Sequence, residues 1–412
     1  MSEKNNKYTP NLRFPEFTGE WEEKKLGEVF TFRNGYTPSK SEPSYWEKGK
    51  IPWFRMEDIR ENGNVLYDST QHITQGAIKG SGCFKANTII VATSATIGEH
   101  ALVKVEHLAN QRFVNMEINN NYSNLVCIEY VYYYMFIIDE ICKSIGNIGT
   151  FASVSTEELS KLSIFLPPTL EEQQKIASCL STIDDLIAAQ AEKVEALKEK
   201  KTGLMQQLFP HPGETTPRLR FPEFTGEWEV KKLGEVASSF SGGTPKSSES
   251  KYYGGDIPFI RSGEIHGCKT ELYITEEGLN KSSAKLVSKG DLLIALYGAT
   301  SGEVAISKID GAINQAILCV RSQSINSNYL CNYLEYKKDT ITSKFLQGGQ
   351  GNLSSDIIMS LNIPSPSPAE QQKIASCLSA LDDQIAAETE KLTAIKDYKK
   401  GLMQQLFPQP AK

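Results

Sequence analysis

The 412-residue sequence has few side chains suited to metal or redox chemistry, and those it has are scattered. The eight cysteines include no Cys-x-x-Cys pair, and the five histidines show no ligand spacing. Zinc sites and disulfide frameworks need closely spaced ligands or paired cysteines, so the sequence predicts free thiols and no metal site. This usage is typical of a protein that folds in a reducing cytoplasm.

Long apolar runs and surplus positive charge are also missing. No stretch approaches the roughly 20 apolar residues of a membrane helix, and residues 1–7 lack the apolar core of a signal peptide. The net charge is −6. Nucleic-acid binding needs surplus Lys and Arg, so this balance argues mildly against a protein that binds DNA alone. If the chain reads DNA, local loops or a partner must supply the positive charge.

The common catalytic signatures are absent. The sequence contains no Gly-x-x-x-x-Gly-Lys-Ser/Thr loop, no Gly-x-Gly-x-x-Gly after a strand and no Gly-x-Ser-x-Gly elbow. It also lacks the Asn-Pro-Pro-aromatic or Asp-Pro-Pro-Tyr segment of amino-methyltransferases. We therefore assign no catalytic residue and no cofactor to this chain.

What the sequence does contain is a tandem duplication. Residues 12–21 (LRFPEFTGEW) recur as 219–228, and residues 173–180 (QQKIASCL) recur as 371–378. The first offset is 219 − 12 = 207 and the second is 371 − 173 = 198, so the segments between the copies differ in length. Two constant modules alternate with two variable ones, which indicates one task performed twice on different targets.

Each repeat ends in a long helical pattern, over residues 169–209 and 367–408. Apolar residues recur at alternating steps of four and three, which predicts a coiled-coil seam. Thr169-x-x-Glu172 and Ser367-x-x-Glu370 have the form of capping boxes at the helix starts. The seam residues are Ile176, Leu180, Ile183, Ile187, Val194, Leu197, Ile374, Leu378, Leu381, Ile385, Leu392 and Ile395.

Two arrangements of these helices are open. Each helix can cover the core of its own domain, or the two can pair with each other. A narrow seam of period 3.5 favours pairing. An antiparallel pair also relates the repeats by a pseudo-twofold axis. In a centred register, Gln190 faces Leu392 and Glu388 faces Val194, and these polar residues set the register.

The predicted fold class is α/β (α+β): two variable domains of the same fold separated by an antiparallel coiled coil. Residues 1–29 and 210–236 are constant or linking segments, and the variable domains span 30–168 and 237–366. Both domains open with Gly-x-Thr-Pro, continue with Ile-Pro-aromatic, and contain β-branched runs separated by Gly- and Ser-rich loops. Further helices are expected near residues 125–142 and 328–343.

The variable loops carry side chains that suit contacts with phosphates and base edges. For the aromatic residues, packing under their own loop is an equal alternative, and the two arginines that end strands are equally suited to internal ion pairs. Asn110-Gln111 and Asn314-Gln315 are unchanged between the copies, which favours an architectural role. The candidates for DNA contact are Arg33, Thr37, Ser39, Lys40, Tyr45, Trp46, Arg55, Lys79, Ser81, Thr96, Thr244, Lys246, Ser247, Tyr252, Tyr253, Arg261, Lys281, Ser283 and Thr300.

These motifs resemble those of the specificity subunits of type I restriction–modification systems. The marks are the Gly-x-Thr-Pro opening, the Ile-Pro-aromatic run and the Glu-Gln-Gln-Lys-Ile-Ala helix start, and they cover both halves of the chain. The resemblance implies a non-catalytic subunit whose two domains each bind one half of a bipartite, asymmetric site in double-stranded DNA.

The resemblance also implies partners. Two modification (methyltransferase) subunits would dock on the helices, and restriction subunits with translocase and nuclease activity would join them. S-adenosylmethionine, ATP and magnesium would belong to those partners. The candidates for partner binding are Glu172, Gln173, Gln174, Glu370, Gln371 and Gln372. Two other classes stay open: a coiled-coil adaptor for protein or glycan, and an enzyme whose site lies in one Gly-rich loop.

Overall fold

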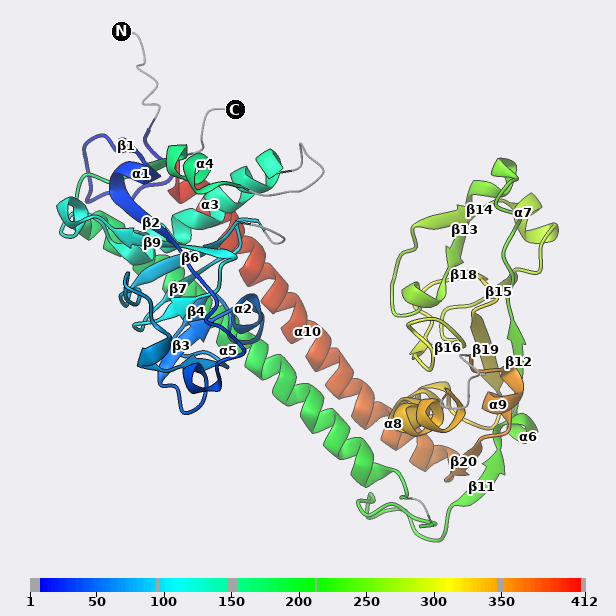
Figure 1. The fold of residues 1–412 in the computed structure, drawn as a ribbon. Helices are drawn as coiled ribbons and strands as arrows, with labels where there is room; N and C mark the ends of the chain where they lie inside the picture. The colour runs from blue at the N-terminus through cyan, green and yellow to red at the C-terminus, as the bar shows by residue number, and fades with distance from the viewer. Residues whose placement is uncertain (1–7, 94–96, 147–153, 212, 347–351, 409–412) are drawn as a thin grey trace. The chain divides into compact units, whose positions relative to one another are not determined.

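The computed structural model (Figure 1) describes residues 8–93, 97–146, 154–211, 213–346 and 352–408. The chain divides into two compact units, one of residues 1–189 with 392–412 and the other of residues 190–391. Each unit contains one variable domain, the start of one long helix and the end of the other.

Within the described residues, the first domain has a five-stranded sheet in the order β2-β9-β6-β7-β4, a three-stranded sheet β5-β3-β8 and the ribbon β1-β10. The strands are β1 (Glu22–Lys25), β2 (Phe30–Asn34), β3 (Ile51–Phe54), β4 (Val65–Leu66), β5 (His72–Ile73), β6 (Thr88–Ala92), β7 (His100–Val103), β8 (Leu108–Ala109), β9 (Phe113–Ile118) and β10 (Ser163–Leu166). The helices are α1 (Leu26–Val29), α2 (Met56–Asn62), α3 (Ile128–Gly146) and α4 (Thr156–Lys161).

Strand β6 shows why this sequence forms a central strand. Its run Thr-Ile-Ile-Val-Ala is rich in β-branched residues and is buried throughout. Successive side chains of a strand point to opposite faces. Ile89 and Val91 accordingly join one apolar cluster, while Ile90 and Ala92 join another. The sheet therefore has a core on each face.

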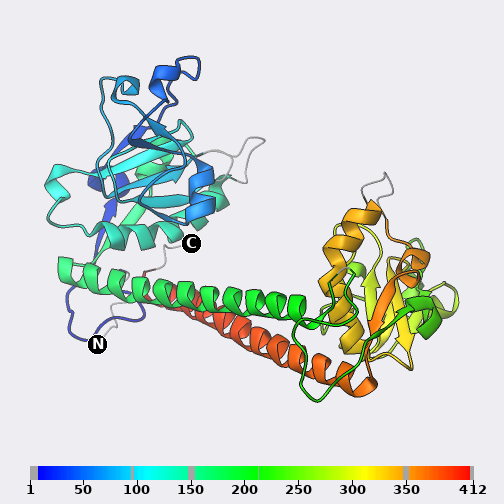
Figure 2. The same cartoon turned by 90° about the horizontal axis from the view of Figure 1, so that it is seen from below.

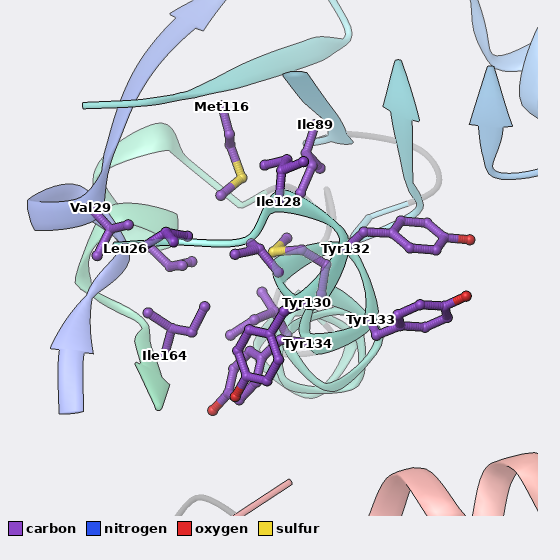
Figure 3. Close-up of a cluster of buried hydrophobic side chains, with 14 of the residues drawn as sticks. Leu26, Val29, Ile89, Met116, Ile128, Tyr130, Tyr132, Tyr133, Tyr134 and Ile164 are labelled. Atoms are coloured by element: carbon purple, nitrogen blue, oxygen red, sulfur yellow. The ribbon is translucent and has the colours of Figure 1, made fainter. Parts of the chain in front are cut away.

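Helix α3 covers one of these faces (Figure 3). Tyr130 and Tyr134 lie in the cluster with Leu26, Val29 and Ile164. Burial of a tyrosine requires a partner for its hydroxyl. The Tyr130 hydroxyl donates to the carbonyl oxygen of Phe165 in β10 at 2.5 Å, which fixes the end of the domain against α3.

The second domain repeats this plan within the described residues. Its sheets are β12-β19-β16-β17, β14-β13-β18-β15 and β11-β20. The strands are β11 (Glu229–Lys232), β12 (Ala237–Ser241), β13 (Tyr253–Ile260), β14 (Leu272–Ile274), β15 (Lys285–Val287), β16 (Leu292–Ala295), β17 (Val304–Ile306), β18 (Gly311–Ile313), β19 (Ile317–Ser322) and β20 (Asn362–Ser365). The helices are α6 (Leu233–Val236), α7 (Glu276–Asn280), α8 (Ser327–Leu346) and α9 (Ser355–Met359).

The long helices are α5 (Leu170–Leu208) and α10 (Pro368–Leu406), each of 39 residues. In the first unit, Asp184 near the start of α5 forms an ion pair with Lys399 near the end of α10. In the second unit, Lys201 near the end of α5 forms an ion pair with Asp382 near the start of α10. The helices therefore pack antiparallel, as predicted, and Figure 2 shows both as continuous.

Both arrangements considered for the helices occur, in different stretches. Ile176 and Leu180 of α5 join the core of the first domain, together with Leu406 at the end of α10. Leu208, Ile374 and Leu378 join the core of the second domain. Between these ends, Val194 and Leu381 are buried, and Ile183, Ile187, Leu197, Ile385, Leu392 and Ile395 are half-buried.

Two local predictions about the helices need correction. Gln190 was expected opposite Leu392, but its amide Nε2 donates to Glu388, at 2.8 Å to Oε2 and 2.9 Å to the backbone oxygen. The predicted capping boxes are half-formed. The hydroxyls of Thr169 and Ser367 each accept from the backbone N–H three residues on, at 3.3 Å. The carboxylates of Glu172 and Glu370 instead bind arginines, because a charged donor is the stronger partner.

Candidate nucleic-acid interface and docking faces

The Gly-x-Thr-Pro openings are tied to the Asn-Gln pairs in both domains. Thr37 donates to the side chain of Gln111, and Thr244 donates to that of Gln315. The chain passes so close here that a Cβ on Gly35 would lie 2.2 Å from the Ala109 carbonyl oxygen. The glutamines therefore hold the loops in place, while Asn110 and Asn314 accept from backbone N–H groups of their own turns, and the two threonines contact that framework.

Exposed cations flank the loops of the first domain. Lys40 is exposed, and the Lys79 ammonium lies 4.9 Å from the centre of the Tyr36 ring. The Arg55 guanidinium lies 5.9 Å from the Trp53 ring, and its buried Nε has no hydrogen-bond partner among the described residues. Glu57 comes only within 3.9 Å of that nitrogen. Arg55 is therefore a cation with unused hydrogen-bonding capacity at a strand end.

Arg33 is committed to its own domain. Its guanidinium pairs with Glu117 at 2.8 Å and donates to the carbonyl oxygens of Ser81 and Cys83. It also lies 4.2 Å from the centre of the Phe84 ring. These contacts hold the Arg33 guanidinium within the first domain, and its side chain is 27% exposed.

The loop aromatics pack largely against their own domain. Trp46 and Trp53 meet edge to face at 5.0 Å, and Tyr45 joins the same cluster. In the second domain, Tyr253 packs beside Phe259 and donates its hydroxyl to the Pro245 carbonyl oxygen at 2.7 Å. The packing alternative therefore holds for Tyr45, Trp46 and Tyr253, whereas half-buried Tyr252 has the Lys251 ammonium 5.3 Å from its ring centre.

Arg261 is the second-domain counterpart of Arg55, and its surroundings are acidic. Its guanidinium pairs with Glu264 at 2.9 Å and with Glu271 at 2.6 Å. The hydrogen bonds that Arg261 donates to these carboxylates raise the pKa of Arg261 further above its ordinary value. The internal ion-pair alternative is thus the one that this arginine adopts.

The other candidates differ in accessibility. Among the described residues, Lys246 and Lys281 form no ion pair and are exposed, like Lys40 and Lys79. Thr300 is half-buried, and Thr96 lies outside the described residues. The serine candidates Ser39, Ser81, Ser247 and Ser283 are all exposed.

Four of the six partner-binding candidates are not accessible to a partner in this structure. Glu172, Gln173, Glu370 and Gln371 are each at most 2% exposed. Gln173 accepts from the Cys127 backbone N–H at 2.8 Å and donates to the Leu125 carbonyl oxygen at 2.9 Å. Their repetition is therefore explained by packing inside the chain.

The arginines that hold these carboxylates were not predicted from the sequence. Arg13 binds Glu172 through two nitrogens, at 2.7 and 2.8 Å, and Arg220 binds Glu370 in the same way, at 2.8 and 2.9 Å. Both arginines stand in the repeated LRFPEFTGEW segment, so the segment joins each helix start to its own unit. The repeats contained a signal for this ion pair, because an arginine recurs in the LRFPEFTGEW segment and a glutamate recurs at the helix start.

One helix face is both repeated and accessible. Gln174, Ser178, Ser181 and Asp185 follow the helical period of α5, and each is exposed. The same four residue types recur on α10 as Gln372, Ser376, Ser379 and Asp383, all exposed except half-buried Ser379. We call these two sets the polar stripes. The α5 stripe borders a groove of about 530 Å³ that Tyr132 and Tyr133 of α3 also line.

Two kinds of feature are absent from the described part of the chain. No group of three or more His, Cys, Asp or Glu side chains is arranged to hold a metal ion. No helix there is long and apolar enough to cross a membrane.

Comparison with known proteins follows the same division of the chain. A family model described as "Type I restriction modification DNA specificity domain" matches residues 18–199 and again 225–397. The type I restriction enzyme EcoprrI specificity subunit of Escherichia coli is 38% identical over 219 residues, which are 53% of this chain and 54% of that protein. The MjaIX specificity subunit of Methanocaldococcus jannaschii is 27% identical and covers 94% of this chain and 92% of its own length.

Solved structures have the same fold. The type I restriction–modification S subunit from M. genitalium superposes with a TM-score of 0.59 at 16% identity, covering 98% of this chain and 100% of the other. A chain from a study of complex assembly in the type I R-M system gives a TM-score of 0.61 at 19% identity, covering 96% of this chain and all of the other.

Proposed function

The chain belongs to the family of type I restriction–modification DNA specificity subunits, the non-catalytic component of those enzymes, and from this premise we propose that its two domains read the two halves of one bipartite DNA site. The observation that supports this proposal is the contrast between the domains. They share a common sheet order and one set of loop anchors, but Arg261 is held by Glu264 and Glu271, whereas the Nε of Arg55 has no hydrogen-bond partner among the described residues. Two readers of different half-sites need this combination.

In the first domain we assign DNA contact to Lys40, Lys79 and Arg55. The two lysines are exposed and suit phosphates, whereas the partly exposed guanidinium of Arg55, which donates no hydrogen bond to the described residues, suits a base edge. In the second domain we assign phosphate contact to Lys246 and Lys281, and a structural role to Arg261. The recognition domains in this proposal are residues 30–168 and 237–366.

We further propose that one modification subunit docks on each polar stripe. A surface that recurs unchanged, stays accessible and lies at the same helical positions fits a partner that binds twice. The α5 stripe adjoins a groove, which gives a partner side chain a place to enter. The helices between the domains would then set the gap between the half-sites. S-adenosylmethionine would belong to these subunits, and ATP and magnesium to restriction subunits that join them.

The experiment that tests the proposal is methylation mapping of DNA from cells carrying the chain with its modification subunits. We expect one motif with two specified halves and an unspecified gap between them. A continuous motif without a gap, or no chain-dependent methylation with soluble partners present, would contradict it.

A further inference from the structure

The helix pair contains one place where equivalent residues of the two repeats touch each other. Gln190 and Glu388 occupy the same repeat position, because 388 − 190 = 198 is the offset of the helix repeats. The Gln190 amide Nε2 donates to the Glu388 carboxylate at 2.8 Å and to its backbone oxygen at 2.9 Å. We call this contact the crossing. Here the two copies meet although their residues differ.

The charges around the crossing are unevenly exposed. Lys193 and Lys391, which also occupy one repeat position, both place Nζ 3.0 Å from Glu388 Oε1. The Glu388 side chain is only 8% exposed, whereas the lysine side chains are 52% and 61% exposed. The carboxylate therefore lies in the seam, while the ammonium groups lie mostly in water, where their attraction is screened.

Two other ion pairs between the helices do not distinguish one helix from the other. The ion pairs Lys201–Asp382 and Lys399–Asp184 are repeat equivalents of each other. A pairing of two identical helices would reproduce both of them. The seam on either side is aliphatic in both repeats. The crossing is therefore the contact that can distinguish a mixed pair of helices from a pair of identical ones.

Two identical helices would make a poorer crossing. Two copies of α5 would bring two glutamines together beside two lysines, with no carboxylate to bind. Two copies of α10 would place two poorly solvated carboxylates against each other, which destabilises the charged forms. We propose that the crossing makes helix pairing heterotypic: α5 selects α10 over a second copy of itself, and α10 likewise selects α5. This inference does not depend on the proposed function.

A double-mutant cycle in the full-length chain measures this preference directly. Glu388→Gln creates the crossing of two α5 helices, and Gln190→Glu creates that of two α10 helices. The double variant Gln190→Glu/Glu388→Gln exchanges the two residues and restores a mixed crossing. The two lysines stay in equivalent places, so the exchanged carboxylate meets the same set of donors.

The measurement is backbone amide exchange in residues 186–197 and 384–395, which reports local opening of the helices. We expect each single variant to exchange about tenfold faster than wild type, within the range of coupling between contacting residues. The double variant should return to the wild-type rate. A matched control is Glu195→Gln, which removes a carboxylate that is 63% exposed and pairs only at the surface, and it should change nothing.

Additive behaviour would overturn the proposal. If the exchange rate of the double variant rises over wild type by the product of the two single fold-increases, the helices have no preference for a mixed crossing. Wild-type exchange in both single variants would overturn it too. If Gln190→Glu does not fold, the comparison of the double variant with Glu388→Gln decides, because only a heterotypic preference makes the second substitution protective.

Discussion

Arg55 and Arg261 follow equivalent strands, but their neighbours give them different roles. Arg55 retains a buried nitrogen with no partner among the described residues, and Arg261 is held by two carboxylates. A guanidinium with free donors can bind a guanine edge, whereas one already bound to glutamates must first lose those bonds. The two domains thus use one framework position differently.

This difference predicts the effect of alanine substitutions on DNA binding. Arg55→Ala should cost about 1–3 kcal/mol and relax one position of one half-site. Lys40→Ala, Lys79→Ala, Lys246→Ala and Lys281→Ala should each weaken binding to all sequences similarly and lower the salt slope by about one. Fluorescence titration of the complex on matched and mismatched duplexes, across salt concentrations, measures both effects.

Arg261→Ala is the matched comparison for Arg55→Ala. It should leave base preference unchanged and lower the thermal stability of the second domain. If Arg261→Ala relaxes a base position and Arg55→Ala does not, the assignment of the two arginines is wrong. Wild-type binding in all the alanine variants would place the DNA face elsewhere.

Arg13 and Arg220 carry a separate prediction, about stability. Their carboxylate partners Glu172 and Glu370 have side chains that are 0% and 2% exposed. Removal of the cation leaves a buried charge unpaired, so Arg13→Ala should lower the free energy of unfolding of its unit by about 3–5 kcal/mol. Chemical denaturation followed by tryptophan fluorescence measures this change, because Trp21 contacts Glu172.

Two further variants show whether the loss comes from the unpaired buried charge. Arg13→Ala with Glu172→Gln should recover part of the loss, because the residue left behind no longer carries charge. Arg218→Ala removes a surface cation whose side chain is 63% exposed and should cost at most about 1 kcal/mol. Equal losses for Arg13→Ala and Arg218→Ala would show that the buried pairs do not join the repeated segment to the helix.

At the scale of elements, the polar stripes predict how many partners bind. Ser178→Arg should block one modification subunit and Ser376→Arg the other, because each places a long charged side chain at the centre of one stripe. Native mass spectrometry of the reconstituted complex should show two modification subunits for the wild type, one for either variant and none for the double variant.

Leu186→Arg is the control, since Leu186 is 52% exposed on α5 but has no counterpart in the other repeat, where Gln384 stands. It should retain two partners. A complex with two modification subunits on the double stripe variant would exclude these faces as docking sites.

The elements differ in how far the sequence predicted them. The long helices were predictable because their seam repeats over ten positions and twice in one chain. The burial at the helix starts was not predictable because repetition alone does not reveal it: Glu172 and Gln173 are buried, while Gln174 is exposed. The contacts of the loop side chains could not be predicted from the sequence either. Arg33 is bound by residues that the fold brings to it from distant positions, whereas the Nε of Arg55 has no partner among the described residues.

At the scale of the whole molecule, the helix pair is predicted to act as a ruler. Four residues inserted after Val194 in α5 and four after Ile385 in α10 lengthen both helices at one level by about 6 Å, at 1.5 Å per residue. Duplex DNA advances about 3.4 Å per base pair. The gap between half-sites should therefore grow by one or two base pairs, with both half-site sequences unchanged. Methylation-motif sequencing of the variant measures the gap.

A matched variant with the insertion in α5 alone should be less active, because it breaks the register of Lys201 with Asp382 while the crossing stays in place. An active paired-insertion variant with an unaltered gap would mean that DNA bending absorbs the added length, at a cost of a few kcal/mol. The helices would then support the two domains without setting the gap between the half-sites.

The most direct test of the account is an exchange of one recognition domain. Residues 30–168 are replaced by the first domain of another specificity subunit, and the methylated motif is sequenced in cells that contain the modification subunits. We predict that one half of the motif changes to that of the donor, while the other half and the gap stay the same. A change in both halves, or in neither with full methylation activity, would contradict the claim that each domain reads its own half-site.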